Sequence, residues 1–338
     1  MPKTDMMRTL LKIAVSAAIV SGCAGEPEAT RHEINGLAQG TTYHIVYNHP
    51  EPIVSVYHTD SILGVFDKSC SLWDSTSLIS RINRNETDTV DRNIKECLEL
   101  ALRLSRESDG LYDVTVAPLT EAYGFGSGPR ATEPDIDSLM QLVGYEKINL
   151  AGRIITKSDP RVRIDLNSIA QGYSADVLAR YLEKRGIEDY LVEVGGEIIC
   201  SASNDGKPWR VGIDRPVEGN YSPGADLQVI LALSSEGLAT SGNYRKFYTD
   251  EKGRPVHHSI DPRTGKSTVN EMLSATVVAP SAIEADAYAT LMMISGLEDS
   301  RRILDRNRKL AAYIVYAAED GTMKVFVSDN MKKRIEDR

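Results

Sequence analysis

Beyond its first segment, the 338-residue sequence contains no apolar run approaching about 18 residues, the length that a membrane-spanning helix needs. We therefore expect the rest of the chain not to cross a membrane. Internal repeats and low-complexity tracts are also missing. Basic residues are fewer than acidic ones: the chain has 39 Lys and Arg and 48 Asp and Glu, which gives a net charge of −9. An acidic surface repels phosphate backbones, so nucleic acid is not expected as a partner.

Cysteine is scarce, with four residues in the chain. One of them, Cys23, ends the first segment, and the spacing of Cys70, Cys97 and Cys200 matches no zinc-binding pattern. Each of these three lies in an apolar stretch, which favours buried free thiols. One disulfide is the alternative if the protein is exported.

A phosphate-binding P-loop is excluded as well. Residues 265–267 read Gly-Lys-Ser, which resembles the end of that motif. The glycine that the motif requires at its start is replaced by Ile260, so the loop cannot be of this type.

The N-terminal segment has the features of an export signal. Basic side chains come first, and residues 13–20 form an apolar run that is too short to span a bilayer. Val-Ser-Gly-Cys at 20–23 resembles the lipobox of bacterial lipoproteins, in which the leader is cut before a cysteine that becomes lipidated. The resemblance implies a signal peptide at 1–22, a tether at 23–32 lipidated on Cys23, and a membrane-anchored protein facing the periplasm or another extracytoplasmic side. An ordinary secretory leader with an incidental cysteine is the alternative.

The remaining sequence is expected to form one domain at 33–330, since 41% hydrophobic and 26% charged residues are typical of globular proteins. Apolar and β-branched patterns predict strands at 41–47, 162–166, 190–194, 209–213, 228–233, 275–279, 312–317 and 323–327. Helical spacing predicts helices at 93–108, 168–185, 282–294 and 298–309. Strands outnumber helices and several are neighbours in the sequence, which favours an α+β fold over a doubly wound parallel sheet.

Two segments combine turn residues with the start of a strand or helix. Gly40 and Thr41 permit a ligand to approach the backbone closely, although a simple turn into a strand is the better explanation of this segment taken alone. At 165–173, a strand that ends in Asp165 is followed by a helix whose first free N–H groups can bind an anion. A capped helix without a ligand is the alternative.

Two further segments carry ionisable side chains. Residues 257–266 contain two histidines, an Asp-Pro turn and Arg-Thr-Gly, so this loop offers donors, acceptors and a titratable group. A purely structural turn is the alternative. Asp286 and Thr290 lie one helical turn apart and therefore on one face. A carboxylate with a hydroxyl suits a hard cation such as Mg²⁺. The alternative, an acidic residue favoured by the helix dipole, explains Asp286 but explains Thr290 less well.

Taken together, these segments resemble the periplasmic FAD:protein FMN transferases, a family first named as thiamine-biosynthesis lipoproteins. The similarity runs from Gly36 to Val327 and rests on segments that occur in the same order: 38–43, 72–83, 110–115, 165–176, 194–198, 240–245, 258–265 and 285–290. The resemblance implies an α+β fold with mixed or antiparallel sheets, and FAD held in a cleft between two closely packed lobes.

The resemblance also implies the site residues. The family's FAD contacts fall on polar, aromatic and apolar positions of this chain, namely Gln39, Trp73, Leu111, Tyr112, Asp113, Asn167, Tyr173 and Ile260. Its Mg²⁺ ligands fall on the backbone oxygen of Ala170 and on Asp286 and Thr290, with Ala289 nearby.

The chain departs from the family pattern at three positions. Gln39 stands where Met is frequent, Gln171 where many relatives have Lys, and Glu197 where Asp is often found. The contact expected of Gln39 and any charge-based role at position 171 are therefore open.

The implied reaction is the Mg²⁺-dependent transfer of FMN from FAD to a threonine hydroxyl of a target protein, with release of AMP. The implied target is a membrane electron-transfer subunit whose acceptor signature is Asp, two variable residues, a small hydroxyl residue, Ala or Gly, and Thr. His258 is the candidate base for the threonine proton, because an imidazole titrates near neutral pH. Asp261 could orient this histidine or simply fix the turn.

Two other functions remain open from the sequence. Water could replace the protein acceptor, which would make the protein an Mg²⁺-dependent FAD pyrophosphatase that yields FMN and AMP. A flavin-binding lipoprotein without catalysis is the second alternative, although storage needs no metal and leaves Asp286 and Thr290 unexplained.

Overall fold

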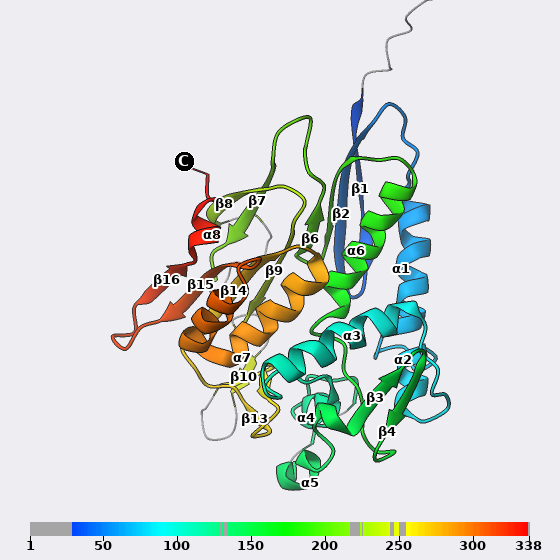
Figure 1. The fold of residues 1–338 in the computed structure, drawn as a ribbon, viewed down its shortest axis with the longest axis vertical. Helices are drawn as coiled ribbons and strands as arrows, with labels where there is room; N and C mark the ends of the chain where they lie inside the picture. The colour runs from blue at the N-terminus through cyan, green and yellow to red at the C-terminus, as the bar shows by residue number, and fades with distance from the viewer. Residues whose placement is uncertain are drawn as a thin grey trace, which may run out of the picture.

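The computed structural model describes residues 29–128, 130–131, 134–216, 224, 226–243, 247–249 and 255–336. Within them an eight-stranded sheet runs through the molecule, and each strand is antiparallel to its neighbours (Figure 1). In spatial order its strands are Thr30–Ala38 (β1), Thr41–His49 (β2), Asp189–Val194 (β5), Glu197–Cys200 (β6), Gly237–Gly242 (β9), Met272–Ala279 (β14), Ala311–Ala317 (β15) and Met323–Val327 (β16).

The other strands of the described chain form two-stranded sheets. These pair Ile148–Ala151 (β3) with Ile154–Lys157 (β4), Trp209–Asp214 (β7) with Leu227–Leu233 (β8), Phe247–Thr249 (β10) with Pro255–His257 (β11), and Ile260–Asp261 (β12) with Lys266–Ser267 (β13).

Helices cover one face of the large sheet, where α6 (Ala170–Lys184) and α7 (Ala282–Arg306) lie side by side in Figure 1. The other helices of the described chain are Val56–Cys70 (α1), Leu78–Asn83 (α2), Arg92–Glu107 (α3), Val114–Val116 (η1), Ala117–Ala122 (α4), Ile136–Met140 (α5), Tyr145–Lys147 (η2) and Asp329–Lys332 (α8). In the part of the chain that the structure describes, no helix has the length and apolarity needed to cross a membrane.

Both faces of the central strands are buried, and β14 shows how. Val277 packs among side chains of α3 and α7, whereas the next residue, Val278, packs with Trp209 of β7 and Leu231 of β8. Successive residues of a strand point to opposite faces, so the large sheet is a middle layer between the helices and the β7–β8 pair. This burial explains the nearly continuous apolar run of β14.

The expected α+β fold is confirmed, but the expected strand at 162–166 is wrong. The backbone of Ile164 bonds to the side chain of Asn83, which accepts the N–H and donates to the carbonyl, both at 2.8 Å. Asp165 N–H donates to the Val114 carbonyl at 2.7 Å. The segment is buried and apolar, yet Asn83 of α2 and Val114 of η1, rather than a neighbouring strand, satisfy these hydrogen bonds.

The helices expected at 282–294 and 298–309 are confirmed as the two helical halves of α7, which are separated by the non-helical residue Gly296, where φ is 77° and ψ is 175°. Other boundaries differ from expectation. Residues 30–32 of the expected tether already pair with β2. The signal peptide at 1–22 and Cys23 lie outside the described residues. Cys70, Cys97 and Cys200 are buried free thiols, as their apolar surroundings predict.

The start of α6 lies unusually close to α7. A side chain at Gly172 would meet the Ala282 carbonyl at 2.4 Å and Cβ of Asp286 at 2.7 Å. Only glycine fits at this contact, so the tight approach of the two helices depends on that residue. This crossing sets the position of Asp286.

Candidate active site

A cleft of about 380 Å³ opens between β9, α6 and α7 on one side and the residues around α4 and the 258–262 loop on the other. Most of the residues expected at the site line it. They are Gln39, Trp73, Tyr112, Asp113, Asn167, His258, Ile260, Asp286 and Thr290.

Asp286 and Thr290 face the cleft together from α7, as their spacing predicts. The helix begins at Ala282, where the carboxylate of Asp176 accepts the first two N–H groups, each at 2.9 Å. Thr290 Oγ1 lies 3.4 Å from the hydroxyl of Ser241 in β9. The pair is therefore held between a capped helix start and strand β9 of the large sheet.

The charge of Asp286 is not balanced by a cationic side chain in the described residues. Its Oδ2 atom accepts the N–H of Gly172 at 3.0 Å. Burial raises the pKa of this carboxyl to about 7, and the nearby Asp176 carboxylate adds to the rise, while the Gly172 bond opposes it. A cation bound here would stabilise the ionised form.

The donor set fits Mg²⁺ bound together with a phosphorylated substrate. No group of three or more His, Cys, Asp or Glu side chains gathers within the described ranges, so the ion would need further oxygens. Mg²⁺ commonly takes one or two protein oxygens and completes its shell with waters and substrate phosphates. Ala170 opens α6 two residues before Gly172, whereas Ala289 is fully buried and does not line the cleft.

Two buried aspartates shape the opposite wall. Asp113 Oδ1 accepts both the N–H and the hydroxyl of Thr115 at 2.7 Å, which starts η1. Asp165 accepts the N–H of Asn167 at 2.8 Å and the hydroxyl of Thr120 at 3.0 Å. Burial raises the pKa of both carboxyl groups despite these hydrogen bonds. Both side chains line the cleft and fix the loops around it.

Gln39 lies in the turn between β1 and β2. Its φ is 55° and that of Gly40 is 73°, the pattern of a tight two-residue hairpin turn. Its Oε1 atom accepts a hydrogen bond from the hydroxyl of Ser174 at 3.2 Å. Nε2 is buried and forms no hydrogen bond in the described chain, although the amide lies beside the Asp67 carboxylate. A ligand in the cleft could supply the missing acceptor.

The rim of the cleft is aromatic. Trp73 lines the mouth with 67% of its surface exposed, and Phe125 stands edge-on to the His258 ring at 6.2 Å between centroids. A flat ring system entering the cleft would cover this exposed apolar surface.

His258 and Asp261 face different spaces. His258 lines the cleft, while Asp261 lines an adjoining pocket of about 350 Å³. Asp261 Oδ1 accepts the N–H of Arg263 at 2.9 Å, and the Arg263 guanidinium lies 3.3 Å from the same oxygen. These bonds shape the turn between β12 and β13. Fixing this turn is one of the two roles considered for Asp261, and orienting His258 is the other.

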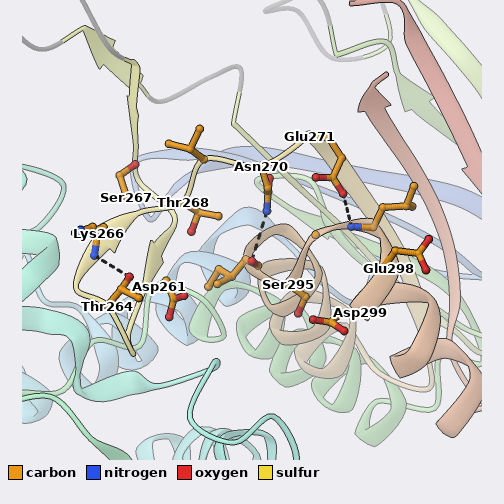
Figure 2. A pocket seen from close by; sticks show the side chains of 14 residues that line it. Asp261, Thr264, Lys266, Ser267, Thr268, Asn270, Glu271, Ser295, Glu298 and Asp299 are labelled. Atoms are coloured by element: carbon orange, nitrogen blue, oxygen red, sulfur yellow. Dashed lines mark hydrogen bonds between the residues drawn. The ribbon is translucent and has the colours of Figure 1, made fainter. Parts of the chain in front are cut away.

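Figure 2 shows the adjoining pocket, where residues that follow the β12–β13 hairpin form hydrogen bonds with α7. Asn270 donates to the Met293 carbonyl at 2.8 Å, and Glu271 accepts the N–H of Leu297 at 2.8 Å. Both residues satisfy backbone groups that the break at Gly296 leaves without helical partners. The half of α7 that carries Thr290 thus ends at a fixed point beside the hairpin.

Leu111 and Tyr173 are not brought to the cleft. Leu111 is buried in the helical core. The Tyr173 ring packs 5.9 Å from the ring of Phe66, and its hydroxyl accepts from Arg180 at 3.1 Å. Both residues therefore pack in the core beneath the wall of the cleft and do not line the cleft itself.

Sequence reasoning did not assign three residues of β9 that line the cleft, Thr240, Ser241 and Gly242. The segment 240–245 belongs to the resemblance, but its small side chains offered no chemical signal. Their importance comes from their place in the sheet, which the sequence alone does not reveal.

The fold and cleft define an α+β protein whose site joins a buried carboxylate, a hydroxyl and an aromatic rim, an arrangement suited to a phosphorylated ligand with a flat ring. Residues 39–314 match the model of the ApbE family. Over 339 aligned residues, the chain is 32% identical to the FAD:protein FMN transferase of Vibrio cholerae, covering 96% of this chain and 98% of the relative. Identity to the Klebsiella pneumoniae enzyme of the same name is also 32%, with coverage of 94% and 95%.

Solved structures agree with these sequence matches. The flavin transferase ApbE from Vibrio cholerae superimposes with a TM-score of 0.79 at 30% identity, over 90% of this chain and 99% of that one. The apo flavinyl transferase ApbE from Pseudomonas stutzeri gives 0.77 at 27% identity, over 91% and 97%. The chain therefore belongs to the ApbE family of flavin transferases, which confirms the resemblance seen in the sequence.

Proposed function

We propose that this enzyme transfers FMN from FAD to a threonine hydroxyl of a protein acceptor in an Mg²⁺-dependent reaction that releases AMP. The observation that carries the proposal is the buried Asp286 carboxylate beside Thr290, without a cationic side chain as partner in the described residues and open to the cleft. The names of the Vibrio cholerae and Klebsiella pneumoniae relatives support FAD as the donor and a protein as the acceptor.

The chain's own residues would position the reactants. Asp286, Thr290 and the Ala170 carbonyl would hold Mg²⁺ against the pyrophosphate, and the bound ion would neutralise negative charge on the phosphate oxygens. Gln39 and Trp73 would contact the flavin end, where an amide donor and an exposed ring are available.

His258 would take the proton from the acceptor threonine on a ring nitrogen as the oxygen attacks the phosphorus on the FMN side. The bond between this phosphorus and the bridging oxygen breaks, AMP leaves with that oxygen, and FMN stays on threonine as a phosphoester. In-line alignment of the two oxygens should provide much of the rate enhancement.

Intact-mass spectrometry tests the proposal. The chain from Ala24 is incubated with FAD, Mg²⁺ and a domain bearing an Asp-x-x-Ser-Ala-Thr segment, and AMP release is followed in parallel. An FMN-sized increment on the acceptor that disappears with EDTA is expected. AMP and free FMN without an increment would indicate a pyrophosphatase, and bound FAD without AMP would indicate a flavin-binding protein.

We also propose that the protein is an exported lipoprotein anchored through Cys23. The support is the sequence alone, since this region lies outside the described residues. Replacing Cys23 with Ser should release the protein from the membrane fraction, and continued anchoring of that variant would refute the proposal. The target is then expected to be a membrane electron-transfer subunit on the same side.

A further inference from the structure

β9 extends beyond the hairpin that lies next to it. The β5–β6 hairpin ends in the two-residue turn Gly195–Gly196, where both φ values are positive, at 64° and 104°. Beyond that turn β9 continues to Gly242 with β14 on its other side. Residues 239–242 therefore have a partner strand on one side only, in the interior of an eight-stranded sheet.

The backbone groups at this open edge have a definite direction. Glu236 accepts the N–H of Cys200, so its backbone faces β6, whereas Asn243 donates to the Leu273 carbonyl and faces β14. Alternate residues of an antiparallel strand direct their N–H and C=O groups to opposite sides. Thr240 and Gly242 therefore direct theirs into the space beyond the hairpin, and these groups have no backbone partner in the described chain.

The open edge lies at the candidate metal site. Thr240, Ser241 and Gly242 line the cleft, and the Ser241 hydroxyl is 3.4 Å from that of Thr290. Thr240 also lines a groove of about 820 Å³ between the large sheet and β7. A polypeptide lying along the edge would thus pass from this groove to a point beside Thr290.

We propose that the open edge of β9 binds an extended segment of the acceptor protein as an added strand, with the acceptor threonine presented beside Thr290. This inference rests on the proposed function. Strand addition uses main-chain hydrogen bonds for affinity and leaves side chains to provide specificity. An unpaired strand edge is a template for such pairing. Here the unpaired edge of β9 begins where the β5–β6 hairpin turns and lies inside the cleft.

An acceptor strand suits this edge better than FAD does. The edge repeats its N–H and C=O groups at strand spacing, which matches another backbone. The groove that continues from Thr240 is about 820 Å³, against about 380 Å³ for the cleft itself. That groove gives the residues flanking the threonine a place to lie, while FAD occupies the cleft.

Backbone methylation of the acceptor provides the first test. Synthetic peptides containing Asp-x-x-Ser-Ala-Thr are N-methylated at one position each and compared with the unmodified peptide as FMN acceptors of the full-length protein. A strand on the β9 edge predicts a period of two, in which alternate positions lose about tenfold in kcat/KM, the effect of removing one or two hydrogen bonds, and intervening positions change little. Equal loss at all positions, or none, would overturn the proposal.

The proposed function is tested separately by the unmodified peptide. If that peptide receives no FMN, the transferase reaction fails with this acceptor before strand pairing is at issue. FMN transfer without a periodic methylation pattern would support the proposed function. It would refute the proposal that the acceptor pairs with the β9 edge.

A second test uses the protein's own backbone with an acceptor domain. Thr240→Pro removes the N–H that faces the cleft and spares the backbone bonds to β14. Like Thr240→Pro, the control Thr240→Val loses the hydroxyl that bonds Thr276 of β14 at 2.8 Å, but it keeps the N–H. The Pro variant should raise the acceptor KM about tenfold relative to the Val variant, with similar FAD affinity in both. A Pro variant that binds FAD more weakly and has an unchanged acceptor KM would mean that FAD occupies the edge.

Discussion

The two walls of the cleft that carry ionisable groups are supported very differently. Asp286 lies where α6 and α7 touch, is buried apart from the face that lines the cleft, and has its helix anchored by the buried Asp176 carboxylate. His258 lies on a short loop beside two strands of two residues each, β12 and β13. The first wall is part of the core, whereas the second is a loop held by a few side-chain bonds.

This difference matches the two halves of the proposed reaction. A pyrophosphate and its cation need fixed oxygens, because electrostatic stabilisation works best when the groups are already in place. A protein acceptor must enter and leave at every turnover, so the group that accepts its proton benefits from a less constrained support.

The largest effect is expected at the rigid wall. Asp286→Asn keeps the size of the side chain but removes the charge that would bind Mg²⁺, and should lower kcat/KM by about 10³-fold, the upper range for losing one electrostatic stabiliser. AMP release measured over a range of Mg²⁺ concentrations checks this. The second proposed ligand, Thr290, offers a matched pair of variants. Thr290→Ser keeps the hydroxyl and should stay far more active than Thr290→Val, which lacks it. Normal turnover by Asp286→Asn would refute the metal assignment.

A smaller loss is expected at the loop. His258→Gln should reduce FMN transfer by about 10²-fold, the lower range for a general base, without changing Mg²⁺ affinity. The neighbouring His257→Gln provides the control, because His257 does not line the cleft. The pH profile at saturating Mg²⁺ is the diagnostic readout: protonation of Asp286 then does not limit metal binding, and loss of a base should remove the remaining acidic limb of kcat/KM. An unchanged limb would exclude His258 as the base.

The sequence predicted the rigid wall better than the rest of the site. Asp286 and Thr290 share a helix face, and that relation follows from local periodicity alone. The positions of Tyr173 and Leu111 depend instead on tertiary packing, which turns both into the core. The segment at 162–166 has a strand-like pattern, but the side chain of Asn83, about 80 residues earlier, takes its hydrogen bonds.

The open edge of β9 is the clearest case of information that the sequence does not contain. The structure shows a tight turn at Gly195 and Gly196, and no local pattern of the sequence indicates that the hairpin beside β9 is shorter than β9. That mismatch arises only when strands from distant parts of the chain pair. Small residues at 240–242 gain their role from this long-range register.

Metal binding should depend on pH at the rigid wall. Burial raises the pKa of Asp286 to about 7, so below that pH the carboxyl of the metal-free protein is protonated and Mg²⁺ must displace the proton. The apparent Kd for Mg²⁺ should therefore rise by about tenfold for each pH unit below 7 and level off above it. Calorimetric titration at several pH values measures this. In Asp286→Asn the pH dependence should disappear, and its persistence would assign the proton to another group.

The smallest effect concerns the anchor of α7. Burial raises the pKa of Asp176 from 3.8 to about 6, although two backbone N–H groups oppose the shift. Ionisation of this carboxyl is thus disfavoured in the folded state, so its contribution to stability is greatest below 3.8 and is lost as the pH rises through about 6. Relative to Asp176→Asn, which does not titrate, the parent protein should lose on the order of 1 kcal/mol per pH unit across this window. Urea unfolding of both proteins between pH 4 and 7 measures the difference. A difference that stays constant with pH would show that the buried carboxyl keeps its ordinary pKa, and α7 would then be anchored by hydrogen bonds without an ionisation cost.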